Sequence, residues 1–171
     1  MKTSGLGEAD YVAAMHSEKM WQRLYKPAAT GTAMDAEELG YRGIRFWRGK
    51  RGEVDPGKAA KSYSKMEQEE GFLCSIEGRL AVQGKWADTR QIYYMKPDRS
   101  AEAWSIVTVV RDASGKQVAA ATETGARDGT SLNIVTTEPG RPVENVSPPA
   151  PGGHISQFEG FLLPRLLVRK K

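Results

Sequence analysis

The residues with the most chemical potential lie between positions 41 and 51, where basic and aromatic side chains are interleaved. Guanidinium groups make paired hydrogen bonds to phosphates and carboxylates, and aromatic rings stack on bases or on guanidinium groups. The segment therefore predicts a partner- or anion-binding surface, for an acidic protein or a nucleic acid. The alternative is an edge strand that its arginines keep soluble. The predicted contact residues are Arg42, Arg45, Phe46, Trp47, Arg48, Lys50 and Arg51.

The C-terminal tail, residues 158–171, combines apolar side chains with a basic end. Pro164 argues against a continuous helix and against a central strand, because proline lacks the backbone N–H group that both need. The tail predicts a docking arm that inserts into a neighbouring subunit. The alternatives are a strand that closes the chain's own sheet and a segment on a membrane surface. The predicted docking residues are Phe161, Leu162, Leu163, Leu166, Leu167, Arg169 and Lys170.

Motifs for metal, phosphate or nucleophile chemistry are weak. The chain has only His16, His154 and Cys74 as candidate zinc ligands of the usual types, which is too few for a zinc site. The stretch 43–50 has one residue too many between its glycines for a phosphate-binding P-loop. The S-x-x-K match at 62–65 lacks its companion motifs. We predict no catalytic residue, no metal and no cofactor.

Two glutamates are candidates for acid–base chemistry inside a barrel. Glu77 and Glu123 lie on expected strands, and a carboxyl group with a raised pKa acts as a general acid or base. The alternation along the strand places Glu77 opposite the apolar side chains, which predicts that it faces solvent.

Strands are the main elements that would position these residues. Between positions 72 and 83, apolar side chains alternate with polar or small ones, which is typical of a strand with one buried face. The buried side carries Phe72, Cys74, Ile76, Gly78, Leu80 and Val82. Gly78 suggests a bend or bulge, and Cys74 is predicted to be inert core. Further strands are expected at 41–48, 90–96, 103–111, 116–124 and 130–137, with turns at 112–115 and 128–129.

The segments outside these strands predict helices and extended chain. Residues 8–26 have pairs at helical spacing, Tyr11 with Met15 and Trp21 with Tyr25, and end before a proline, which predicts a packed N-terminal helix. A second helix is expected at 55–70, although its charges oppose the helix dipole. Residues 139–153 hold five prolines and three glycines, which indicates an extended, weakly structured connector.

The resulting fold class is α+β: a curved antiparallel β-meander, barrel- or cone-like, with a packed N-terminal helix and extended terminal arms. The order of helix, strand, expected helix and meander resembles the curved cone of the NTF2-like proteins, and a small antiparallel barrel is equally compatible. We expect residues 1–40 to form the helix and loop, 41–138 the β domain, and 139–171 the connector and C-terminal arm.

Composition and charge narrow the class of protein. Leu, Ile, Val and Phe together make up only 31 of the 171 residues, so the core is lean. The net charge is +4 over residues 1–65, −3 over 66–140 and +3 over 141–171, and basic flanks suit an acidic partner. A single cysteine, no apolar h-region and no long apolar run predict an intracellular or virion protein without a classical signal or membrane span.

Three functions remain open from the sequence. The leading hypothesis is a non-enzymatic structural or interaction subunit of a larger assembly, a virion or multiprotein complex, that docks on other subunits through its arms. The second is a cofactor-independent isomerase, cyclase or lyase, or a small-molecule binder, whose pocket would be lined by the apolar face of residues 72–82. The third is a nucleic-acid-binding protein that uses residues 41–51.

Overall fold

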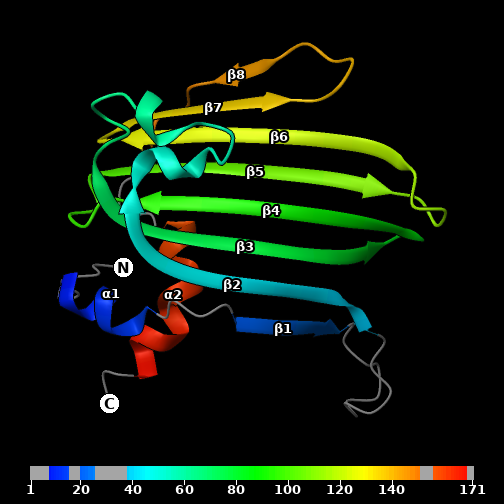
Figure 1. Ribbon diagram of the computed structural model, residues 1–171, viewed down its shortest axis with the longest axis horizontal. Helices are drawn as coiled ribbons and strands as arrows, with labels where there is room; N and C mark the ends of the chain where they lie inside the picture. Colours follow the sequence, from blue (N-terminus) through cyan, green and yellow to red (C-terminus); the bar gives the residue numbers. More distant parts are fainter. Residues whose placement is uncertain (1–7, 16–19, 26–37, 151–155, 169–171) are drawn as a thin grey trace.

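The chain forms one antiparallel sheet flanked by two helices. The computed structural model describes residues 8–15, 20–25, 38–150 and 156–168, without the side chains of Tyr25 and of residues 163–168. Within these residues, eight strands follow one another across the sheet in sequence order (Figure 1), which confirms the predicted antiparallel meander. The elements are α1 (Glu8–Ala14), β1 (Met20–Tyr25), β2 (Glu38–Lys50), β3 (Glu70–Val82), β4 (Lys85–Met95), β5 (Ala101–Arg111), β6 (Gln117–Asp128), β7 (Ser131–Thr137), β8 (Glu144–Val146) and α2 (Gln157–Val168).

The sheet is open, with β1 and β8 at its two edges. Closure into a barrel or cone is therefore not confirmed. The expectation of an edge strand at 41–48 is wrong, because β2 pairs with β1 on one side and with β3 on the other. Its side chains Ile44 and Phe46 are only 3% and 1% exposed. The arginines of β2 therefore belong to a strand of the core, not to an edge strand.

Strand β3 keeps the predicted alternation but not the predicted bulge. Phe72, Cys74 and Ile76 are buried on one face. The pairing of β2 with β3 runs without a register shift through Gly78. A side chain at this glycine would collide with the backbone of β2 at Tyr41 and Arg42. Gly78 therefore permits a close approach of two strands and makes no bulge.

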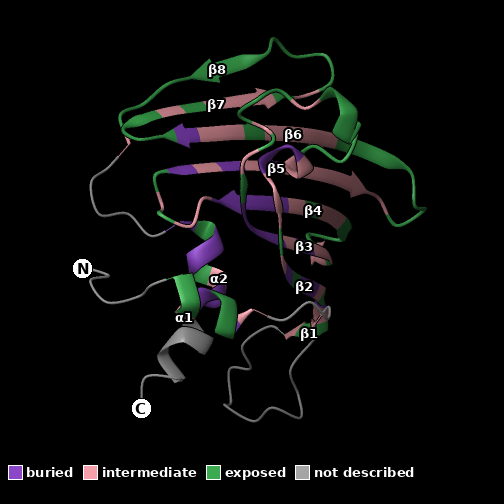
Figure 2. Cartoon of the chain, turned by 60° about the vertical axis from the view of Figure 1, so that its left-hand side comes forward, coloured by how far each residue is buried: buried purple, intermediate pink, exposed green. Residues whose placement is uncertain are grey.

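The two faces of the sheet are covered by different parts of the chain. Helices α1 and α2 cover one face, called here the helix face. Segment 51–69 covers the other, called here the loop face (Figure 2). The buried members on the helix face are Tyr11, Ala14, Ile44, Phe46, Phe72, Cys74, Ile76, Tyr93, Met95, Phe158 and Leu162. The smaller cluster on the loop face is Leu73, Ile92, Tyr94 and Ala103, packed against Trp47 and Val54.

The predicted helix at 8–26 is too long. Helix α1 ends at Ala14, and residues 20–25 form strand β1 at the edge of the sheet. Trp21, assigned to a helical pair with Tyr25, instead lies against Tyr41 of the neighbouring strand, with ring centroids 5.7 Å apart. Pairing with β2 satisfies the backbone of this segment and brings two aromatic rings together, which outweighs its helical spacing.

Segment 51–69 contains no α-helix, so the expectation of a helix at 55–70 is also wrong. It forms two short 3-10 turns, Arg51–Val54 and Ala60–Ser62, joined by loops. Glu67 holds the loops together, because its carboxylate accepts hydrogen bonds from Lys58 Nζ and from the backbone N–H of Ser64. These bonds lower the pKa of Glu67 to about 2, with the Lys58 bond as the largest cause.

The C-terminal segment is helix α2, so the expectation that Pro164 prevents a continuous helix is wrong. Ser156 and Glu159 form a capping box: Ser156 Oγ accepts from the Glu159 N–H at 3.0 Å, and the Glu159 carboxylate accepts from the Ser156 N–H at 3.1 Å. Phe158 and Leu162 are 1% and 0% exposed. The cap and this burial offset the cost of a proline inside a helix, about 3 kcal/mol.

The described part of the expected connector, residues 139–150, is more ordered than its composition indicates. Residues 144–146 form the short edge strand β8, which pairs with Ile134, Val135 and Thr136 of β7. The chain continues alongside β7, where the Ala150 N–H donates to the carbonyl of Thr130 at 3.2 Å. Together, β1 and β8 extend the sheet from Met20 to Val146.

Candidate ligand-binding pocket

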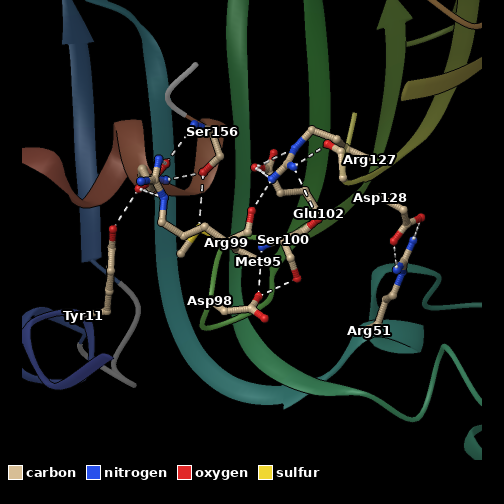
Figure 3. Close-up of polar contacts among 12 residues, drawn as sticks. Tyr11, Arg51, Met95, Asp98, Arg99, Ser100, Glu102, Arg127, Asp128 and Ser156 are labelled. Carbon is tan, nitrogen blue, oxygen red and sulfur yellow. Dashed lines mark hydrogen bonds and ion pairs between the residues drawn. The ribbon is translucent and has the colours of Figure 1, made fainter. Parts of the chain in front are cut away.

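A network of buried polar groups fastens α2 to the rest of the chain (Figure 3). Glu159, 3% exposed, accepts a hydrogen bond from the hydroxyl of Tyr11 at 2.8 Å and pairs with Arg99 at 2.8 Å. Burial, followed by the hydrogen bond and charge of Glu159, raises the pKa of Tyr11 to about 12. One carboxylate therefore links α1, α2 and the turn between β4 and β5.

Two further arginines close the same end of the sheet. Arg127 pairs with Glu102 at 2.7 Å and also donates to the backbone carbonyls of Arg99 and Gly129. Arg51 makes two hydrogen bonds to the carboxylate of Asp128, at 2.7 and 2.9 Å. Both guanidinium groups are bound to partners within the chain, which indicates that they hold the strand ends and the start of segment 51–69 in place.

Next to this network lies a pocket of about 350 Å³ on the helix face, called here the α2 pocket. Its walls come from strands β4 to β7, from Ala150 and from the first turn of α2. The side chains that line it are mostly apolar, with the Glu102–Arg127 pair at one side and Glu123 at another. Its apolar lining residues include Tyr93, Trp104, Ile106, Leu132, Ile134 and Phe158.

The shape of the α2 pocket depends on a large residue opposite a glycine. Trp104 of β5 pairs directly with Gly125 of β6, and a side chain at Gly125 would occupy the space of the Trp104 indole ring. The indole therefore lies across β6, and its N–H donates to Glu123 Oε1 at 2.8 Å. This bond orients both the aromatic wall and the carboxylate.

The Glu123 carboxylate lines the α2 pocket on the strand β6. Within the described residues no Lys, Arg or His pairs with its carboxylate, and the Trp104 N–H is the hydrogen-bond donor that it has. Arg127 lies on the same face but is neutralised by Glu102. Burial raises the pKa of Tyr93 to about 12, and the charges of Cys74 and Glu123 make smaller contributions in the same direction. The pocket thus holds a carboxylate beside aromatic walls.

The structure disperses the basic residues predicted to form one surface. The register confirms the predicted alternation: Arg42, Phe46 and Arg48 lie on the helix face, and Arg45 and Trp47 on the loop face. Phe46 is core, Arg42 bonds to Gln22 and lies over the Phe161 ring, and Arg48 bonds to Glu8 and lies over Phe72. Lys50 bonds to Gln68, and Arg51 is 5% exposed and bound to Asp128. Arg45 lies over Trp47, whose N–H donates to Glu53.

The docking residues of the tail lie on or beyond helix α2. Leu162 is fully buried in the chain's own core, and Phe161 lies against Tyr93 with ring centroids 6.3 Å apart. The side chains of Leu163, Leu166 and Leu167 and the residues Arg169 and Lys170 lie outside the described part of the chain, as do His16 and His154.

The remaining candidates have structural surroundings. Cys74 is fully buried, as predicted, and burial raises the pKa of its thiol to about 12. Glu77 is on the loop face, with its side chain 38% exposed and 3.7 Å from Arg90, which agrees with the expected orientation away from the core. In the described part of the chain, no group of three or more His, Cys, Asp or Glu side chains is arranged to hold a metal ion.

The sequence pointed to Glu123 but missed the pocket around it. The pocket was expected against residues 72–82, but α1 and α2 pack against β3 on the helix face, and the pocket lies farther along that face, over β4 to β7. Trp104, Tyr93 and Phe158 were not assigned to it. Glu123 and Gly125 lie two residues apart on β6, opposite Ile106 and Trp104 of β5. This arrangement is the signal that could have located the pocket, but it is visible only once the strand register is known.

Comparison with known proteins adds no relationship: no family model, no curated protein and no solved structure matches this chain. None of the helices in the described ranges combines the length and apolar character needed to cross a membrane.

Proposed function

We propose that the chain binds a small, largely apolar molecule in the α2 pocket. The observation that supports this function is the pocket itself, whose volume of about 350 Å³ and apolar aromatic lining are typical of small-molecule sites. Its polar groups are few and held in place by neighbours, which is the arrangement that orients a ligand rather than merely enclosing it.

Binding is favoured over catalysis by the state of the polar groups around the pocket. The hydroxyl of Ser156 is engaged in the α2 cap and donates to the sulfur of Met95 at 3.6 Å. Glu102 is paired with Arg127. No nucleophile lies beside a free base among the described lining residues, so the geometry supports a receptor for a ligand.

The test fills the pocket and uses a neighbouring residue as control. Ile134 lines the α2 pocket, and Val135 points to the opposite face of the same strand. Binding of the neutral dye N-phenyl-1-naphthylamine, followed by fluorescence, is expected to be about tenfold weaker or more in Ile134→Trp. Val135→Trp should bind as the wild type does, and urea unfolding verifies that both variants fold. Equal binding to both variants, or none to the wild type, would exclude the proposal.

A second candidate is the subunit of a larger assembly, favoured by one surface feature. Trp21 and Tyr41 lie together on β1 and β2 and are 62% and 43% exposed, and exposed aromatic side chains are common where protein partners dock. Native mass spectrometry of the wild type and of Trp21→Ala tests it. A complex that Trp21→Ala abolishes would support this role, and a monomer in both samples would exclude it.

A further inference from the structure

The charges around the α2 pocket indicate the class of its ligand, and this inference rests on the proposed function. Of the two carboxylates that line the pocket, Glu102 is neutralised by Arg127 at 2.7 Å, whereas Glu123 pairs with no cation of the described residues. The Trp104 N–H occupies Glu123 Oε1, and no described group donates to Oε2. A carboxylate beside apolar walls gains most from a ligand that supplies a positive charge.

The strand register adds to the negative potential at this point. Glu123 of β6, Thr136 of β7 and Glu144 of β8 lie in one row across the sheet. With strands roughly 4.8 Å apart, Glu144 is therefore about 10 Å from Glu123, slightly beyond the Debye length of about 8 Å in physiological salt, so salt partly screens its contribution. On its other side, the row continues through Ile106 and Gln91, which are uncharged.

The aromatic walls suit the same kind of ligand. Tyr93, Trp104 and Phe158 all line the pocket, and ring faces attract cations, most strongly when water is excluded. A carboxylate and several aromatic faces around one cavity favour an organic cation over an anion of the same size.

We propose that the ligand of the α2 pocket is an organic amine. Its protonated nitrogen ion-pairs with Glu123, and its apolar part lies against Trp104, Tyr93 and Phe158. The Trp104 hydrogen bond holds the carboxylate in the orientation that receives the amine.

The test compares three probes with the same hydrocarbon skeleton: 3-phenylpropylamine, 3-phenylpropan-1-ol and 3-phenylpropionate. Each displaces N-phenyl-1-naphthylamine from the wild-type protein at neutral pH. The amine should bind about tenfold more tightly than the alcohol, because its ammonium adds an ion pair to the hydrogen bond that either probe can donate to Glu123, and the carboxylate should bind most weakly. This comparison needs no variant and so does not depend on a variant folding.

The variant Glu123→Gln then removes the charge and keeps an oxygen that accepts from Trp104. It should weaken binding of the amine more than binding of the alcohol, and so lose the preference for the amine. Glu77→Gln makes the same change on the loop face and should keep that preference. Equal binding of all three probes to the wild type, or an amine preference that survives in Glu123→Gln, would overturn the amine assignment and leave the pocket proposal standing. Failure of the dye and of every probe to bind would overturn both.

Discussion

The two faces of the sheet are packed by different means. On the helix face, the ring of Phe158 lies 5.8 Å from that of Phe46 and 6.0 Å from that of Phe72, and all three side chains are buried. On the loop face, strands β5 to β7 present small side chains beneath segment 51–69. They are Ala103, Ser105, Val107, Thr122, Thr124, Ala126, Asn133 and Val135. Large interlocking rings exclude water, whereas small side chains under a loop leave a broad, open groove.

The two faces also differ in how their charged side chains are paired. The loop face pairs them: Arg79 with Asp88 at 2.6 Å, and Lys58 with Glu67 at 2.7 Å. The helix face pairs Glu102 and Glu159 with arginines but leaves Glu123 without a cation from the described residues. The carboxylate without a described cation therefore lies beside Trp104 in the lining of the α2 pocket, where a ligand cation would gain most.

The largest effect should come from removing the aromatic anchor of α2. Phe158→Ala deletes a ring that contacts Phe46 and Phe72, and should lower the free energy of unfolding by about 3–5 kcal/mol. Val54→Ala, in segment 51–69 over the loop face, should lower the free energy of unfolding by only about 1 kcal/mol, because that side chain is only partly buried. Urea unfolding curves measure both. Similar losses in the two variants would show that the faces contribute alike.

A smaller, pH-dependent effect should come from breaking the Arg51–Asp128 ion pair, which holds segment 51–69 against the loop face. Asp128→Asn weakens the pair with Arg51, and should lower the free energy of unfolding by about 1–2 kcal/mol, since the Asp128 side chain is 47% exposed and partly screened. The Arg51 hydrogen bond holds the pKa of Asp128 below its ordinary value of 3.8, despite the opposing effect of burial.

The sign of the pH dependence follows from this lowered pKa. A carboxyl group with a depressed pKa in the folded state stabilises the protein above pH 3.8, and loses that contribution as the pH falls through the folded-state value. The difference between wild type and Asp128→Asn should therefore be full at about pH 6 and shrink below pH 3.8. Urea unfolding at several pH values measures it, and a difference that stays constant at low pH would contradict the assignment.

The sequence predicted the central strands well, because their alternation is local. The strand at 72–83 differs from β3 by one or two residues at each end, and the turn at 112–115 links β5 and β6 as expected. At this turn Asp112 accepts from the N–H of Ser114, and Gly115 has a φ of +84°, which are turn chemistries visible in the sequence.

The elements at both ends of the chain could not be predicted from local patterns. Residues 20–25 have apolar pairs at helical spacing, yet they form a strand because β2 offers a free edge. Pro164 disfavours a helix locally, but the burial of Phe158 and Leu162 against the sheet decides the outcome. The α2 pocket depends on both effects, because its wall is α2 and its aromatic and acidic groups meet only through the register of β4 to β7.

The smallest expected effect concerns how fast a thiol reagent reacts with a cysteine on each face. Cys74 is fully buried on the helix face, and burial raises the pKa of its thiol to about 12, so at pH 8 almost no reactive thiolate is present. Ellman's reagent should therefore modify the native wild type very slowly, and rapidly once urea unfolds it. Thr124→Cys places a second thiol on the exposed loop face and should add one fast-reacting equivalent with little change in stability. Rapid reaction of Cys74 in the native wild type would mean that α1 and α2 expose the core around it far more often than the packing of Phe158 predicts. The contrast between the sealed core around Cys74 and the open loop face would then fail.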